Sequence, residues 1–311
     1  MATPGSHPAD TPATPDANPQ RAISARSSAG DVLLDYLTRQ VAELRQQAPL
    51  VHKDAPDSVH QMRMAARRLR SALATGKKLF DDGAVEGIRA ELKWLSGALG
   101  AARDPEVVNE RLRALLAQEP PELVFAAAAE RIDAELSSAA AAGRVAALEA
   151  LDGGRYRRLL GSLDTLLAAA PLADRASAPA PKAMRKLLAK EKARVRGRVR
   201  ALDEPAEEPV SRDVRLHEIR KAAKRVRYAA ETARPVVGKK ARRAEKAAHE
   251  IQAILGVHQD SVVARALLAE LGSRALRSGE NGFTYGRLHA AEEALARSAE
   301  ADFFKAWKKF P

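Results

Sequence analysis

Two segments of the sequence repeat one pattern of histidine and basic residues. The first, VHQMRMAARRLR (59–70), carries four arginines and no acidic residue, and the second, LHEIRKAAKRVR (216–227), carries five bases and one acid. Arginine and lysine donate charge-assisted hydrogen bonds to phosphate and carboxylate oxygens, and a protonated histidine adds another donor. The pattern therefore indicates that both segments bind an anion.

A predicted helix through each segment places these side chains in one arc beside an apolar stripe. Like charges at such spacings destabilise a helix by a few tenths of a kcal/mol per pair, and partial burial adds to this cost. A linear polyanion bound along the helix would reduce both the repulsion between the bases and the cost of burying their charge. The alternative is a solvated face whose long side chains cover the core, but the duplication and the scarcity of acids favour binding. The two arcs consist of His60, Arg63, Arg67, Arg70, His217, Arg220, Lys224 and Arg227.

Composition limits the class of protein. Of the 311 residues, 46% are hydrophobic and 4% are aromatic, and alanine is abundant. This predicts an all-α fold, because alanine, leucine, arginine and glutamate are strong helix formers. The absence of cysteine excludes disulfides and thiolate chemistry. No apolar run reaches the roughly 18 residues of a membrane span, and the N-terminus lacks a signal-peptide core, so we expect a cytoplasmic protein with no membrane partner.

The net charge of +12 is concentrated in a few places. Residues 59–73, 182–200, 216–230 and 239–246 together carry +20, which leaves −8 for the rest of the chain. Such clustering predicts an anionic partner, whereas charge that served only solubility would be spread more evenly.

Helical spacing of apolar residues recurs along the chain after a Pro/Ala/Thr-rich tail (1–30) that we expect to be disordered. A Pro/Ala-rich connector (171–181) divides the remainder, 31–311, into a first helical half (31–170) and a second (182–311). The predicted helices cover 31–48, 57–80, 84–100, 104–118, 122–150, 154–170, 182–202, 212–234, 238–256, 259–278 and 282–309.

The two halves are similar to each other. A shift of 157 residues aligns the two basic segments, and a shift of 156 aligns LGAARD (99–104) with LGVHQD (255–260). Two matches at nearly one offset indicate a duplicated helical unit. We therefore predict that each copy is a small helical bundle and that the two bundles join into one body.

These motifs resemble those of the CHAD family, the conserved histidine α-helical domain. The resemblance rests on the doubled H-x-x-R-x-x-x-[RK]-R-x-R pattern, the paired LGxxxD segments and RYAAE (227–231), and it covers about residues 31–309. It implies two pseudo-symmetric four-helix bundles around a basic central cavity, inorganic polyphosphate as the ligand, and association with polyphosphate granules. The binding residues that it implies are His60, Arg63, Arg67, Arg70, His217, Arg220, Lys221, Lys224, Arg225, Arg227 and Tyr228.

The predicted helix at 182–202 carries further bases on both flanks of an apolar seam. They are additional candidate anion contacts, with a solvated face as an equal alternative. Some CHAD proteins also carry a triphosphatase domain with an E-x-E-x-K motif, which does not occur here. The resemblance therefore predicts a binding module without catalysis. The additional candidates are Lys186, Lys190, Arg194 and Arg198.

No other pattern predicts an enzyme, a cofactor or a metal site. HEIRK (217–221) and HEIQA (249–253) lack the second histidine of the zinc-binding H-E-x-x-H motif, and the surrounding bases would repel a cation. No nucleophile–base pair is apparent. In the LGxxxD segments, capping of helix ends is the preferred interpretation over catalytic carboxylates. The residues assigned to helix ends are Gly100, Asp104, Gly256 and Asp260.

Two alternatives to polyphosphate stay open at this point. A nucleic acid would also bind basic helices, although aromatic stacking residues are few and Asn or Gln base readers are scarce beside the arginines. A helical granule scaffold could instead use its charge to dock to a protein partner, whose identity the sequence does not indicate.

Overall fold

The computed structural model describes residues 23–202, 204 and 211–311. Nine α-helices contain most of these residues, and no strand occurs among them. The helices are α1 (Ala29–His52), α2 (Ser58–Thr75), α3 (Glu86–Leu116), α4 (Ala126–Asp152), α5 (Gly154–Ala168), α6 (Ala180–Arg200), α7 (Arg212–Val237), α8 (Lys239–Arg277) and α9 (Phe283–Trp307), with short 3-10 turns at Lys77–Leu79, Pro121–Leu123 and Asp174–Ser177. The predicted all-α fold is confirmed.

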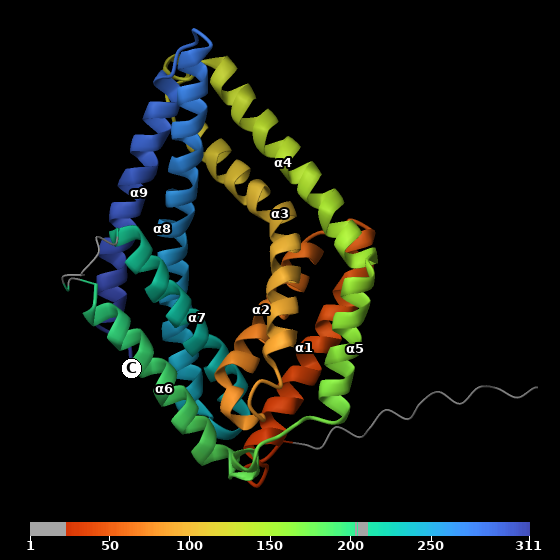
Figure 1. Cartoon of the computed structure of the whole chain (residues 1–311). Coiled ribbons are helices and arrows are strands. Elements are labelled where there is room, and N and C mark those ends of the chain that lie inside the picture. The colour runs from red at the N-terminus through yellow and green to blue at the C-terminus, as the bar shows by residue number, and fades with distance from the viewer. Residues whose placement is uncertain (1–22, 203, 205–210) are drawn as a thin grey trace, which may run out of the picture.

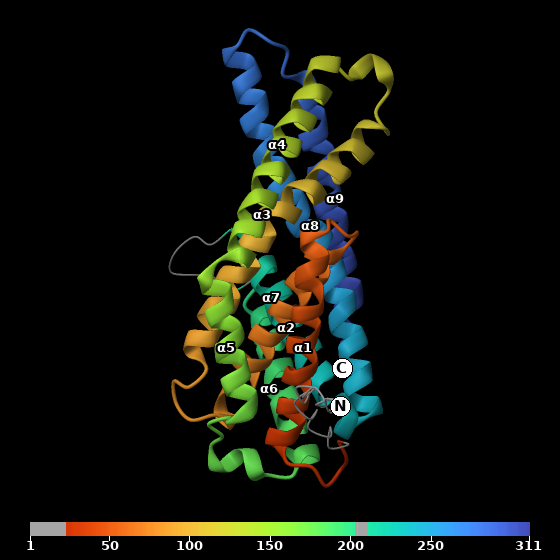
Figure 2. The same ribbon diagram turned by 90° about the vertical axis from the view of Figure 1, so that its right-hand side faces the viewer.

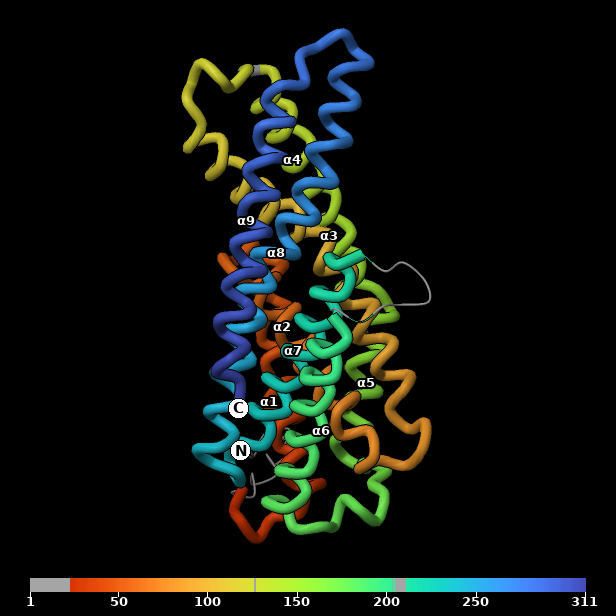
Figure 3. Tube along the Cα trace, turned by 90° about the vertical axis from the view of Figure 1, so that its left-hand side faces the viewer, coloured from red at the N-terminus to blue at the C-terminus, as the bar shows by residue number. Residues whose placement is uncertain are grey.

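The helices form an elongated body (Figures 1 and 2). α3 packs against α4 and α8 packs against α9. In Figure 1 these two pairs lie apart in the middle of the body and come together at its upper end, whereas α1, α2, α6 and α7 occupy the lower part. α6 lies beside α7 along one side of the body (Figure 3).

Buried apolar side chains form two clusters. The larger cluster combines residues of α1, α2 and α5 with residues of α6, α7 and the first part of α8, so both predicted halves contribute to one core. The smaller cluster joins α3 and α4 to α8 and α9 through residues such as Leu112, Ile132, Leu268 and Leu288. Burial of this kind stabilises the fold by about 1.5–3 kcal/mol for each fully buried large side chain.

Helix α1 begins with a capping box. Ser28 Oγ accepts a hydrogen bond from the Asp31 N–H (3.1 Å), and Asp31 Oδ2 accepts one from the Ser28 N–H (2.9 Å). Ser28 also pairs with Pro179 in an isolated β-bridge, which ties the start of α1 to the connector before α6. Residues 1–22 of the predicted tail lie outside the described residues, whereas Ile23 packs on the core. The predicted tail boundary at residue 30 is therefore too late.

The predicted helix breaks at 101–103 and 257–258 are wrong, because α3 and α8 run through them. Pro105 lies inside α3, where its nitrogen cannot donate to the Ala101 carbonyl, and α3 changes direction along its length (Figure 1). Gly143 of α4 packs directly on Ala101. The helix therefore continues past its proline, with α4 supporting it on this side.

We expect Gly143→Ala to lower the melting temperature, because the added Cβ would overlap the backbone of Ala101. Overpacking of this kind costs about 1–3 kcal/mol. Thermal unfolding followed by circular dichroism measures the change. The matched control is Gly97→Ala on α3, where no heavy atom lies within 4 Å of the new Cβ. The free energy of unfolding of Gly97→Ala should rise by about 0.5–1 kcal/mol. Equal melting temperatures for the two variants would contradict the close packing of Gly143.

Candidate anion-binding cavity

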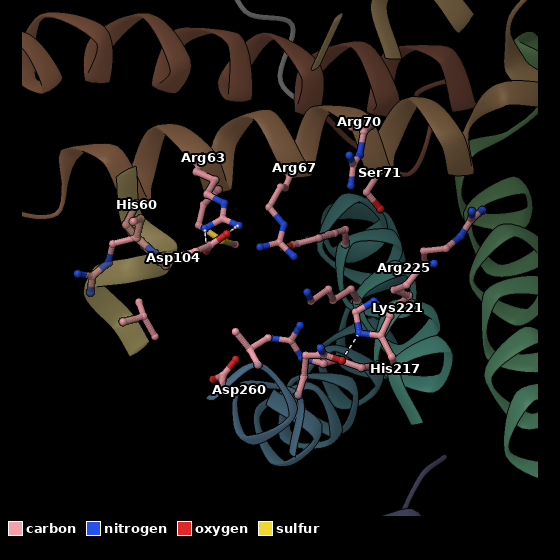
Figure 4. A pocket seen from close by; sticks show the side chains of 18 of the residues that line it. His60, Arg63, Arg67, Arg70, Ser71, Asp104, His217, Lys221, Arg225 and Asp260 are labelled. Carbon is pink, nitrogen blue, oxygen red and sulfur yellow. Dashed lines mark hydrogen bonds and ion pairs between the residues drawn. The ribbon is translucent and has the colours of Figure 1, made fainter. Parts of the chain in front are cut away.

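Four helices, α2, α3, α7 and α8, line a cavity of about 760 Å³ (Figure 4). Both copies of the basic segment face it, and His60 and His217 line it together. Two carboxylates, those of Asp104 and Asp260, also line the cavity, against ten basic side chains. The bases are Arg63, Arg67, Arg70, Arg89, Arg103, Arg111, Arg220, Lys221, Lys224 and Arg225.

The basic side chains of α2 reach the cavity because a neighbouring face of the helix is buried. Met62, Leu69 and Leu73 are fully inaccessible and fix the rotation of α2 on the core. Figure 4 shows the side chains of Arg63 and Arg67 pointing from α2 into the cavity. A period of 3.6 residues thus determines both the buried stripe and the basic arc.

α7 repeats this arrangement from the other side of the cavity. Leu216, Ile219 and Val226 are buried, and the cavity is lined by bases that lie between them in the sequence. Tyr228 of α7 lines the cavity as well. Within the described residues, its buried hydroxyl has no hydrogen-bond partner.

The LGxxxD segments surround the first arginine of each basic segment, instead of capping helix ends as predicted. Arg63 forms an ion pair with Asp104, with Nη2 3.1 Å from Oδ2. A Cβ on Gly100 would lie 3.2 Å from Arg63 Nη2, so the glycine leaves room for the guanidinium. In the second copy, a Cβ on Gly256 would lie 3.6 Å from Nη2 of Arg220. The capping interpretation fails because both glycines lie inside continuous helices.

Four bases at the centre of the cavity form no ion pair among the described residues, and no hydrogen bond joins their side chains to a carboxylate there. Burial is the main cause that lowers the pKa of each, and neighbouring arginines lower it further, whereas the charge of Asp260 partly offsets the effect at Arg220 and Lys224. The effect is greatest for Lys224, where burial together with the charges of Arg67, Arg220 and Arg63 lowers the pKa to about 6. The four residues are Arg67, Arg70, Arg220 and Lys224.

The two histidines differ in their surroundings. His217 is half-buried, and its Nδ1 lies 2.5 Å from Oε1 of Gln259 on α8, so this ring nitrogen carries the proton and donates. Burial lowers the pKa of His217, and the charges of Lys221 and Arg220 also lower it. His60 lines the cavity from an exposed position at the first turns of α2.

Five sequence candidates lie outside the cavity lining. Arg227 donates instead to Gln252 on α8 (3.3 Å), and its guanidinium lies 5.8 Å from the centre of the Tyr228 ring. The four candidates on α6 are exposed and do not line the cavity. These four are Lys186, Lys190, Arg194 and Arg198.

Three cavity arginines lie outside the residues that the sequence patterns predicted, namely Arg89, Arg103 and Arg111, all on α3. Each is isolated from the basic runs and has an acidic partner; Arg111, for example, donates to both oxygens of the fully buried Glu292 at 2.6 Å. Arg103 lies inside the LGAARD motif, which was the one available signal.

Two further properties concern the described part of the chain. No helix there combines the length and the apolarity needed to cross a bilayer. The same residues contain no cluster of three or more side chains of the types that ligate metals.

Comparisons with known proteins define the family. The CHAD domain model matches residues 35–269, and the chain therefore belongs to the CHAD family, as its motifs predicted. Two uncharacterized proteins of Mycobacterium tuberculosis, one from each of two strains, are 34% identical to the chain over 274 residues. The match covers 88% of this chain and 52% of theirs, so the chain spans about half the length of these curated relatives.

Two solved structures have a similar fold. PptA from Streptomyces chartreusis superimposes with a TM-score of 0.74 at 25% identity, covering 91% of this chain and 100% of that one. The CHAD domain from the plant Ricinus communis gives a TM-score of 0.72 at 26% identity, covering 96% of each chain. The elongated helical body is thus shared with CHAD structures.

We expect the ligand-free protein to become more stable as the pH rises from about 6 towards the ordinary lysine value of 10.5, because of Lys224. Over this range the unfolded chain holds a proton on Lys224 that the folded chain lacks, so the free energy of unfolding increases with pH. Thermal unfolding at a series of pH values measures the slope. Lys224→Met, which cannot titrate, is the reference. If stability rose equally with pH in the wild type and in Lys224→Met, Lys224 would not be desolvated.

Proposed function

We propose that the chain binds inorganic polyphosphate in this cavity and performs no chemistry on it. The observation that carries the proposal is the group of four central bases from both copies of the basic segment, which form no ion pair among the described residues and outnumber the two carboxylates of the cavity lining. Phosphate oxygens would supply the missing anionic partners, and each arginine can donate to two of them. Membership of the CHAD family supports the same ligand.

Buried polar atoms without partners also support a ligand in the cavity. Within the described residues, Arg63 Nε, Ser71 Oγ, Arg220 Nε and Tyr228 Oη have no hydrogen-bond partner, and all four residues line the cavity. A buried donor that lacks a partner costs about 1–3 kcal/mol. A ligand with many acceptor oxygens would satisfy several of these donors at once.

The distribution of the bases favours a polymer over a single small anion. His60 to Arg70 covers about 15 Å along α2 at 1.5 Å per residue, and the bases of α7 face them across the cavity. A polymer that contacts bases along this length would release several counterions, which strengthens binding at low salt. One phosphate group would leave most of the bases unpaired.

The proposed location follows from the ligand. A cytoplasmic protein that binds this polymer would be brought to polyphosphate granules, either alone or with a protein partner. In the granule-scaffold alternative, the charge would serve protein docking and the cavity would be dispensable. In the nucleic-acid alternative, duplex DNA would compete for the same bases.

Long-chain polyphosphate should displace duplex DNA from the purified protein at matched salt, because the enclosed cavity suits a flexible anion chain better than a rigid duplex. Its affinity should fall as salt rises, by about 0.7–0.9 log units per log unit of salt for each phosphate contact. Competition followed by fluorescence anisotropy of labelled DNA measures both effects. Equal affinity for the two polymers would favour the nucleic-acid alternative.

Removal of two central bases, in Arg67→Ala with Arg220→Ala, should weaken polyphosphate binding about a hundredfold or more, because each charged contact contributes about 1.5–3 kcal/mol. The melting temperature should stay the same or rise, since repulsion among the central bases is reduced. Calorimetry and thermal unfolding measure the two quantities. The control, Lys239→Ala with Lys240→Ala, removes the same charge from exposed positions outside the cavity lining. An unfolded double variant would show that these arginines are structural.

A further inference from the structure

A strip of charged residues leads from the edge of the cavity on α7 to the exposed face of α6. Lys221 and Arg225 line the cavity, and the side chain of Lys221 is 54% exposed, so the cavity reaches solvent at this edge. Figure 4 shows Arg225 pointing away from the centre of the cavity towards α6, which packs beside α7. The strip thus begins where a bound polymer would leave the cavity.

Glu191 of α6 joins a cavity arginine to a surface arginine. Arg225 Nε and Nη2 donate to its two carboxylate oxygens at 2.8 and 3.1 Å. Arg194 Nε lies 3.4 Å from the same carboxylate. Glu191 is only 1% exposed, whereas the side chain of Arg194 is 41% exposed. The buried acid therefore holds an exposed guanidinium close to one that lines the cavity.

Glu218 of α7 pairs with the second cavity base of the strip. Lys221 Nζ donates to Glu218 Oε1 at 2.6 Å. Arg198 of α6 follows Arg194 by about one helical turn, so the two arginines share one face of α6. Together with the hydrogen bond from Lys221, the charges of Lys221 and Arg198 lower the pKa of Glu218. Arg198 is exposed, as Arg194 is. Glu191 thus links a cavity base to a surface base by ion pairs, and Arg198 extends the surface bases by one turn of α6.

We propose that Arg194 and Arg198, with Lys221 and Arg225, form an exit strip that binds the part of a long polyphosphate chain lying outside the cavity. This inference rests on the proposed function. Four bases share only two acids in the strip, so a positive excess remains along it. Glu191 holds Arg194 and Arg225 in place, which lowers the entropy that each loses when it contacts a phosphate. A phosphate chain is the fitting ligand because it would continue uninterrupted from the cavity bases to the surface bases.

The remaining bases of α6 are not part of the exit strip. Lys186 and Lys190 are exposed, and among the described residues no hydrogen bond or ion pair connects them to a residue that lines the cavity. Of the four sequence candidates on α6, Arg194 is therefore joined to a cavity base through Glu191, Arg198 acts on the charge of Glu218, and the two lysines have neither link.

The test compares two ligands on the full chain. In Arg194→Ala with Arg198→Ala, the affinity for long-chain polyphosphate should fall about two- to thirtyfold, as expected for two exposed ionic contacts. The affinity for tripolyphosphate should not change, because so short an anion is contained in the cavity. Calorimetry with both ligands measures this difference. The variant Arg194→Lys with Arg198→Lys keeps the charges and should recover most of the long-chain affinity.

Lys239→Ala with Lys240→Ala is the control for general loss of charge, because these positions lie about 30 Å along α8 from Gln259 in the cavity lining. It should leave both affinities unchanged. If the Arg194/Arg198 variant bound long chains normally, or lost affinity for both ligands equally, the exit strip would be disproved while the cavity could still bind polyphosphate. If the wild-type chain bound neither ligand, the proposed function itself would fail.

Discussion

Repulsion among like-charged side chains in one partly buried cavity is the constraint on which the rest of the structure depends. Each like-charged pair along a helix costs a few tenths of a kcal/mol, and desolvation adds to this, as the low pKa of Lys224 shows. The apolar stripes of α2 and α7 oppose this cost. Each fully buried side chain such as Leu69 or Ile219 contributes about 1.5–3 kcal/mol, so packing outweighs repulsion and fixes both basic arcs towards the cavity.

Ion pairs lie at the wall of the cavity, whereas its four central bases form none among the described residues. Glu191 pairs with Arg225, Glu292 with Arg111, and Asp104 with Arg63, and each of these bases is held at the wall of the cavity. Each such pair offsets desolvation of its own members but removes charge that a ligand could use. Leaving the central bases unpaired keeps the cavity electropositive where both copies meet. The ion pairs thus stabilise the wall of the cavity, and the positive charge at its centre stays unpaired.

The part of this arrangement that follows from helical period was predictable from the sequence. The 3.6-residue spacing assigned Arg63 and Arg67 to one arc and Arg220 and Lys224 to the other. The structure places all four residues in the lining of one cavity. Single residues outside the basic runs, such as Arg111, were not predictable, because their position depends on how α3 crosses α2. Arg227 occupies the same register as Arg70 but bonds to Gln252, because the neighbouring helix differs. Local pattern determines which face a residue occupies, and tertiary contacts determine what that face meets.

The continuity of α3 and α8 explains why the sequence signals for helix ends were misleading. Glycine followed four residues later by aspartate suits a helix end and a new start, yet within one unbroken helix the same two residues lie on one face, about one turn apart. On α3 this spacing forms a socket: Gly100 leaves space for the Arg63 guanidinium, and Asp104 binds it. A break at 101–103 would separate the two halves of the socket. Gly143 of α4 packs on Ala101, which lies between Gly100 and Asp104, so α4 supports α3 at the arginine socket itself.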